Sequence, residues 1–134
     1  MLSISAGDLR LFLHVLAATV WVGGQFVLLV LIPTLRGLGV DAVGIVARRL
    51  NGVLWAAFGV LIVTGIWNLQ AVNLADQSTA YRHTVVIKLI LVAISGVAAF
   101  VHVRVAAPRA RALSGAATLI GALLALFLGV VLAG

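Results

Sequence analysis

The sequence contains no cysteine and almost no methionine or acidic residues. Among its 134 residues, methionine occurs only as Met1, and Asp and Glu together number 3. The lack of cysteine excludes disulfides, thiolate metal sites, iron–sulfur clusters and covalent c-type haem attachment. Soft Cu(I) sites favour Cys and Met ligands, so the lack of both argues against a Cu(I) site.

Charge of either sign is scarce. Charged residues make up 9% of the chain and hydrophobic residues 64%, whereas soluble domains carry about 25% charged residues. The composition is therefore that of an integral membrane protein. The net charge of +6 does not indicate nucleic-acid binding, because no soluble segment combines a basic run with aromatic residues. No polar stretch is long enough to fold separately, so residues 1–134 are predicted to form a single transmembrane domain.

Apolar runs of membrane-spanning length dominate what is present. The predicted transmembrane helices cover about 8–33, 51–72, 82–106 and 114–134. Pro33 is expected to end the first helix because proline interrupts the hydrogen-bond ladder. Residues 34–50 are then a connector, with a short interfacial helix from Asp41 to Leu50. The predicted fold is all-α, an integral membrane four-helix bundle.

The arginines divide unequally between the two ends of these helices. The first and third connections share one side of the membrane and hold Arg36, Arg48, Arg49, Arg104, Arg109 and Arg111. The opposite side holds Arg10 and Arg82. The positive-inside rule then places both termini on the non-cytoplasmic side, in a bacterial inner (plasma) membrane if the source is bacterial. The first apolar run is too long for a signal-peptide core and is expected to be retained.

A polar and aromatic stripe marks the first helix. At 100° per residue, His14, Ala18, Trp21 and Gln25 fall within about 60° of one another on one helix face. A helix that only anchored the chain would not need such a stripe. An ionisable residue costs several kcal/mol inside the hydrocarbon core, so it marks a candidate functional site. Three residues qualify, namely His14, Lys88 and His102.

Depth along the helices suggests which of these residues meet. His14, Lys88 and Asn68 lie at similar depth and are expected to form one layer on the outer side. His102 is roughly 20 Å deeper, so one metal would not easily be shared between it and His14. His83 faces about 140° away from Lys88, at the membrane surface.

Each candidate also has a structural interpretation. His14 fits a hydrogen-bonded histidine of the bundle core, and Lys88 fits a side chain that extends to the interface. His102 fits an interfacial residue, and His83 fits a solvated residue at a helix start. Trp21 fits a packing aromatic. The sequence alone leaves both interpretations open at every position.

The residues of the first three helices resemble a known family. Residues 13–24 (LHVLAATVWVGG) resemble the opening helix of the CopD copper-resistance domain, where an LHxxAxxxWxGG pattern is typical. Residues 61–67 (LIVTGIW) resemble its second helix, and Lys88-Leu89 resembles the start of its third. The arrangement is also similar to HemJ-type protoporphyrinogen oxidases, four-helix membrane proteins with a histidine in helix 1 and a lysine in helix 3.

These resemblances imply different chemistry. The HemJ-like reading implies haem b between the helices, with His14 as axial ligand and Lys88 as a site residue. Trp21 of the stripe and Asn68 of the outer layer are further candidates for contact with the cofactor. This reading further implies a role in redox or electron-transfer chemistry. The chain would act alone, as a homo-oligomer or within a larger membrane redox complex. The CopD-like reading implies copper uptake or handling at the periplasmic face, with metal candidates His14, His83 and His102.

A third interpretation needs no cofactor. The fourth predicted helix has no ionisable side chain and is rich in Gly and Ala, a composition typical of helix packing in membranes. The chain would then be a non-catalytic subunit that packs against larger membrane proteins. Whether the protein is an enzyme stays open on the sequence.

Overall fold

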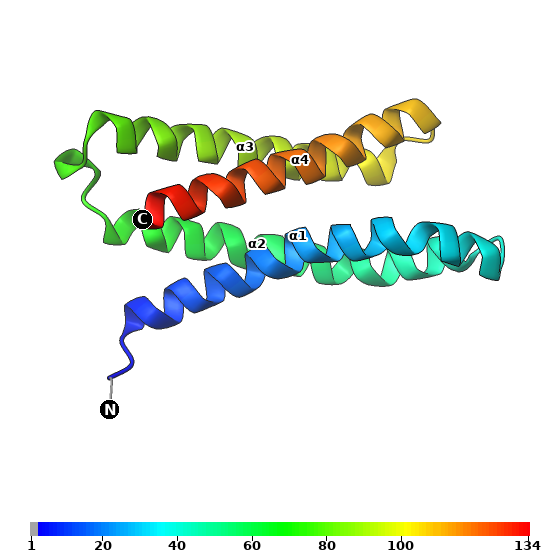
Figure 1. Cartoon of the computed structure of the whole chain (residues 1–134), viewed down its shortest axis with the longest axis horizontal. Helices are drawn as coiled ribbons and strands as arrows, with labels where there is room; N and C mark the ends of the chain where they lie inside the picture. Colours follow the sequence, from blue (N-terminus) through cyan, green and yellow to red (C-terminus); the bar gives the residue numbers. More distant parts are fainter. Residues whose placement is uncertain (1–2) are drawn as a thin grey trace. The chain divides into compact units, whose positions relative to one another are not determined.

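The computed structural model describes residues 3–134, which are almost entirely helical and contain no strand (Figure 1). The elements are α1 (Ala6–Leu38), α2 (Ala42–Ala71), the short 3₁₀ helix η1 (Leu74–Asp76), α3 (Thr79–Arg104) and α4 (Pro108–Ala133). All four α-helices are long and apolar enough to cross a membrane. The predicted all-α class with four transmembrane-type helices is confirmed.

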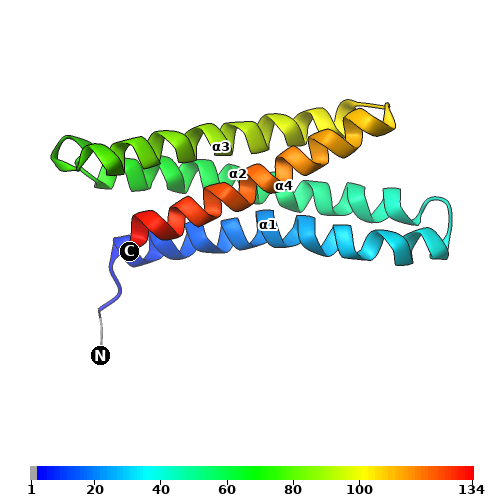
Figure 2. The same cartoon turned by 45° about the horizontal axis from the view of Figure 1, so that its top comes forward.

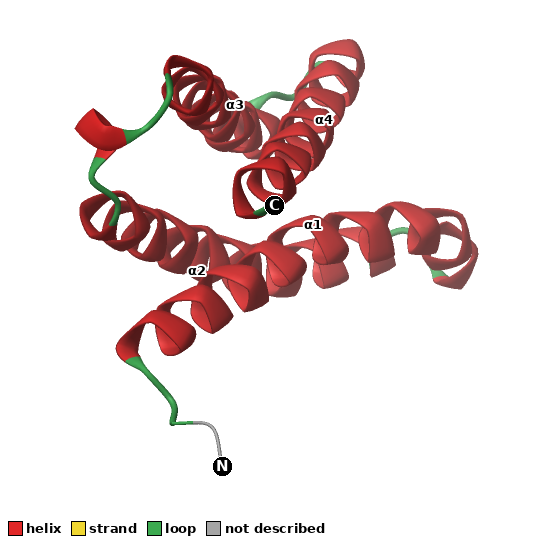
Figure 3. Ribbon diagram, turned by 60° about the vertical axis from the view of Figure 1, so that its left-hand side comes forward, coloured by secondary structure: helices red, strands yellow, loops and turns green. Residues whose placement is uncertain are grey.

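The chain divides into two compact units at Val72. In the first unit α1 packs along α2, and in the second α3 packs along α4 (Figures 2 and 3). Each unit is therefore a helical hairpin with its own interior. The expectation of one domain over residues 1–134 concerns the relation between the two units and stays a prediction.

Two contacts define how α1 lies against α2. His14 meets Thr64, and ten residues further along α1, Gly24 meets Leu54, which lies ten residues earlier in α2. An advance of ten residues along α1 thus corresponds to ten residues back along α2. The two helices therefore run antiparallel and keep one register between these contacts. At Gly24, an added Cβ atom would stand 2.6 Å from Leu54 Cδ2, so the missing side chain allows Leu54 to pack tightly there.

The turn between α1 and α2 is shorter than the sequence predicted. Pro33 lies inside α1, which continues to Leu38, because one proline removes one hydrogen bond and membrane helices tolerate that loss. The helix ends at Gly39, whose φ of 148° is accessible mainly to glycine. The predicted connector over 34–50 is therefore wrong. Asp41 does precede a helix, but that helix is α2 itself, and it runs without a break to Ala71.

The other helix ends differ less. Ser5 and Asp8 form a capping box, and α1 begins at Ala6 rather than near residue 8. α4 begins at Pro108, six residues earlier than predicted. Proline is favoured in the first turn of a helix, where its missing N–H has no intrahelical partner to lose, so Pro108 was a start signal rather than part of a loop.

Small residues bring α3 and α4 together. The Ser95 hydroxyl donates to the Thr118 carbonyl at 2.8 Å. A Cβ atom on Gly121 would stand 3.2 Å from the Leu91 carbonyl oxygen and 3.3 Å from Ser95 Cβ. Such close backbone approach through Gly and Ser is typical of helix pairs in membranes.

Candidate functional site

The His14 side chain is held by a hydrogen-bond relay to α2. His14 Nδ1 lies 2.8 Å from Thr64 Oγ1, and the Thr64 hydroxyl lies 2.6 Å from the Val60 carbonyl oxygen. A threonine hydroxyl has one proton, and the Val60 carbonyl can only accept it. Thr64 Oγ1 therefore accepts the Nδ1–H of His14. Of the two neutral tautomers, this arrangement fits the one that is protonated on Nδ1.

The surroundings of His14 keep the ring in place. Thr64 is buried and His14 partly buried. The neighbouring Gly65 leaves room for the ring, since a Cβ atom there would stand 3.6 Å from His14 Cε1. A histidine oriented through Nδ1 is typical of metal-ligating imidazoles, whose other nitrogen binds the metal. Within residues 3–134, no group of three or more His, Cys, Asp or Glu side chains is close enough to hold an ion.

Arg10 lies one helical turn before His14 on α1. Its Nε atom is buried and has no hydrogen-bond partner in the part of the chain that the structure describes. Asp8, the nearest acid in the sequence, is already bonded to the backbone N–H and hydroxyl of Ser5, at 2.8 and 2.6 Å. An unpaired buried guanidinium nitrogen is costly, so this end of the hairpin suits an anionic group from outside the chain.

Asn68 lies on α2 one turn beyond Thr64 and is partly buried. By the antiparallel register of α1 and α2, it stands at the level of Arg10. The register thus places Asn68 one turn away from the level of His14, and its place in the site stays a prediction. Thr64, the residue that orients His14, was not predicted as a site residue. A buried hydroxyl at the depth of an intramembrane histidine was the signal that could have identified it.

Trp21 belongs to an aromatic cluster in the first unit. Its ring centroid lies 4.7 Å from that of Phe58 and 5.9 Å from that of Trp55, and the latter two are 5.6 Å apart. Trp21 is 4% exposed. The predicted stripe on α1 therefore does face α2 at His14 and Trp21. Gln25 departs from it, because its amide donates to the Trp21 carbonyl on its own helix.

Lys88 occupies α3 in the second unit and is partly buried. Its Nζ atom lies 2.9 Å from the place that a Cβ on Gly129 would occupy, so the ammonium group rests against the backbone of α4. The acidic residue of this unit, Asp76, is hydrogen-bonded to Asn73 in the turn before α3. Over residues 73–134, then, the structure gives Lys88 no carboxylate partner.

His102 joins the end of α3 to the start of α4. Its Nδ1 lies 2.8 Å from the Arg111 carbonyl oxygen and 3.4 Å from Ser114 Oγ. A Cβ on Gly115 would stand 3.0 Å from His102 Cε1, so the ring fills the space above that glycine. This contact favours the structural interpretation of His102. His83, in the first turns of α3, is exposed as expected.

The predicted site residues thus divide between the two hairpins. The first holds His14, Trp21 and Asn68, and the second holds Lys88, His83 and His102. The expected layer of His14 with Lys88 relates one unit to the other and stays a prediction. Comparison of the chain with protein-family models, curated proteins and solved structures gives no match in any of the three.

Proposed function

We propose that this chain is a multi-pass membrane protein that binds haem b through Nε2 of His14 and takes part in redox or electron-transfer chemistry. The observation that carries the proposal is the relay from His14 Nδ1 through Thr64 to the Val60 carbonyl. A donor at Nδ1 supports Nε2 as the nitrogen that would bind the iron as axial ligand. The resemblance of residues 13–24 to the CopD and HemJ-type helix supports the same residue.

The donor set is suited to a porphyrin. Haem brings four nitrogen ligands of its own, so a single protein imidazole is sufficient to hold the iron. Copper would need further protein ligands beside His14. The interior of a helix bundle is also a common location for such a cofactor. When bound, haem would supply one-electron redox chemistry, while His14 and its relay would set the ligand and its orientation.

Arg10 supplies the second part of the proposed site. Its buried Nε has no partner in residues 3–134, and it follows the same face of α1 one turn before His14. A haem propionate would satisfy this guanidinium by a charge-assisted hydrogen bond.

The proposed location is a bacterial inner membrane with both termini on the non-cytoplasmic side. The four apolar helices support a multi-pass protein. The excess of arginines in the helix ends that flank the α1–α2 and α3–α4 turns supports this orientation. His14 then lies in the outer half of the membrane, where an electron carrier on that side can approach it.

The test is an absorption spectrum, with metal analysis, of the protein purified in mild detergent beside two histidine variants. The proposal expects a Soret band and reducible α and β bands that are lost in His14→Ala. His83→Ala, which removes an exposed histidine, should leave these bands unchanged. Arg10→Gln should keep the bands but lower the haem content per protein, because it removes the proposed propionate partner.

The alternative functions give different results in the same experiment. Stoichiometric copper that is lost in His14→Ala, without a Soret band, would indicate copper handling at the periplasmic face. Neither pigment nor metal, together with co-migration of larger membrane subunits, would indicate a non-catalytic packing subunit.

A further inference from the structure

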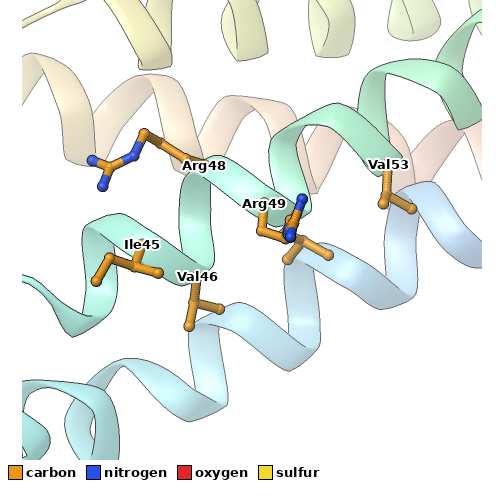
Figure 4. A pocket seen from close by; sticks show the side chains of 6 residues that line it. Ile45, Val46, Arg48, Arg49 and Val53 are labelled. Atoms are coloured by element: carbon orange, nitrogen blue, oxygen red, sulfur yellow. The ribbon is translucent and has the colours of Figure 1, made fainter.

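A basic groove runs along the first turns of α2, away from His14 and its relay. It has a volume of about 710 Å³ and is lined by Ile45, Val46, Arg48, Arg49, Leu50 and Val53 (Figure 4). Four of these six side chains are apolar. Two consecutive arginines therefore stand within a surface that is otherwise aliphatic.

The position of the arginines on α2 is the first observation. Residues 50–71, which follow them to the end of the helix, contain no charged residue. At 1.5 Å per residue this segment is about 33 Å long, close to the thickness of about 30 Å of a bilayer's hydrocarbon core. Arg48 and Arg49 thus lie at the border of that core, at the level of the lipid phosphates.

The arrangement of the side chains is the second observation. Arg48 folds back along its own helix, and its Nη1 atom lies 3.4 Å from the place of a Gly44 Cβ. Leu50 extends towards α1, with Cδ1 3.7 Å from the place of a Gly24 Cβ. Figure 4 shows that the Arg48 and Arg49 side chains leave the helix in different directions. Leu50 lies on the side of α1.

Charge is the third observation. Both arginines are exposed, and over residues 3–134 neither has an ion-pair or hydrogen-bond partner recorded in the structure. Asp41, one turn before Ile45, is the single acid near this end of the hairpin in sequence, and Arg36 in the last turn of α1 offsets it. The groove is thus net positive, which favours an anionic ligand over a cationic one.

We infer that this groove binds one anionic phospholipid of the surrounding membrane. Its phosphate would lie against Arg48 and Arg49, and an acyl chain would cover the aliphatic wall from Leu50 to Val53. This ligand class matches both parts of the groove, since it places a negative charge at the border of the hydrocarbon and a chain within it. Basic side chains at this level are known determinants of anionic-lipid binding. A zwitterionic lipid carries the same chains but a compensating positive charge.

Native mass spectrometry of the full chain in detergent tests the inference. Phosphatidylglycerol and phosphatidylcholine with identical acyl chains are added in turn, and the fraction of protein that retains one lipid is measured. The wild type should retain phosphatidylglycerol preferentially. The double variant Arg48→Gln/Arg49→Gln should weaken that retention by about tenfold or more, because each basic residue at the surface contributes to anionic-lipid affinity. Arg48→Lys/Arg49→Lys keeps the charge and should retain most of the preference.

The matched control removes two charges elsewhere. Arg104→Gln/Arg109→Gln, in the second hairpin, lowers the net charge by the same amount but leaves the groove intact, and it should retain phosphatidylglycerol as the wild type does. Equal loss in the control would overturn the inference in favour of diffuse attraction. So would equal retention of the two lipids, or displacement of the lipid by inorganic phosphate at equal concentration. If the double glutamine variant does not fold by circular dichroism, the single variants Arg48→Gln and Arg49→Gln serve, each with a smaller expected loss.

Discussion

The Nδ1 atom of His14 lies 2.8 Å from the Oγ1 atom of Thr64, 50 residues further along the chain. The hydroxyl of Thr64 is in turn directed to the Val60 carbonyl of its own helix. One contact therefore does two things in the first hairpin. It marks the register of α1 against α2, and it engages Nδ1 of the imidazole as a donor.

Replacement of Thr64 by valine should separate these two effects. Thr64→Val keeps the shape but leaves the Nδ1–H of His14 without its acceptor, which we expect to lower the free energy of unfolding by about 1–2 kcal/mol. The same variant should shift the Soret and α bands if haem is bound, because the ligand loses its orienting partner. Thermal unfolding in detergent, followed by circular dichroism, and the absorption spectrum are the measurements.

Thr64→Ser is the matched control for this variant. Serine retains the hydroxyl, so it should preserve the spectrum and lose only the packing of one methyl group. If serine and valine shift the spectrum alike, the hydroxyl does not orient His14 and the relay is not part of the site.

Sequence reasoning was sufficient for the number of the membrane-type helices, and it singled out His14 as a candidate whose role stays a prediction. Long uncharged runs predict membrane-spanning helices because hydrocarbon tolerates few other structures, and an intramembrane histidine stands out against such a background. The helix ends were harder. Pro33 and Pro108 are both prolines next to arginine-containing segments, yet Pro33 lies inside α1 and Pro108 begins α4. Whether a proline interrupts, begins or lies within a helix depends on whether the backbone on both sides of it is helical. The proline itself does not reveal this.

The partners of the candidate residues were beyond the sequence. Thr64 and the Arg111 carbonyl are found only once the register of each hairpin is known, because a slip of one residue would turn either partner away by about 100°. The Lys88–Gly129 contact is of the same kind. An apolar sequence predicts that its few polar side chains need hydrogen-bond partners. Which residues become those partners depends on how the helices pack.

Gly121 offers a direct test of the close packing in the second hairpin. A Cβ added there would stand 3.2 Å from the Leu91 carbonyl oxygen and 3.3 Å from the Ser95 backbone nitrogen. Since these neighbours are backbone atoms of α3, the helices must separate to accept a methyl group. We expect Gly121→Ala to destabilise the protein by about 1–3 kcal/mol.

The control for Gly121 is Gly59 on α2, where an added Cβ would meet nothing within 4 Å. Gly59→Ala should be neutral or stabilising by about 0.5–1 kcal/mol, because alanine restricts the unfolded chain more than glycine does. Thermal unfolding of both variants in one detergent decides the matter. Equal melting temperatures would mean that α3 and α4 are not in close contact at Gly121.

His102 should contribute to stability and not to cofactor binding. His102→Ala removes the hydrogen bond from the ring to the Arg111 carbonyl and leaves a space above Gly115, so we expect a loss of about 1–3 kcal/mol. The absorption spectrum of the purified protein should not change. Loss of the Soret band in His102→Ala, with circular dichroism unchanged, would contradict this and return His102 to the candidate ligands. His83→Ala, at an exposed position of the same helix, should change neither property.

We expect Lys88 to lower the stability of the protein relative to an apolar residue of similar size at this position. Its ammonium group lies against Gly129 of α4, between two apolar helices. Over residues 73–134 no carboxylate pairs with it. A lysine at the centre of a membrane helix costs about 2.5–3.5 kcal/mol, and less towards its ends. Lys88→Met fills nearly the same volume without the charge, so we expect it to raise the melting temperature of the protein free of added cofactor. Lys88→Arg keeps the charge and should give no such gain. A lower melting temperature for Lys88→Met would show instead that the ammonium group makes a net favourable contact with α4. The increase, if found, would mean that Lys88 is retained at a cost in stability, which is expected of a residue that binds an anion.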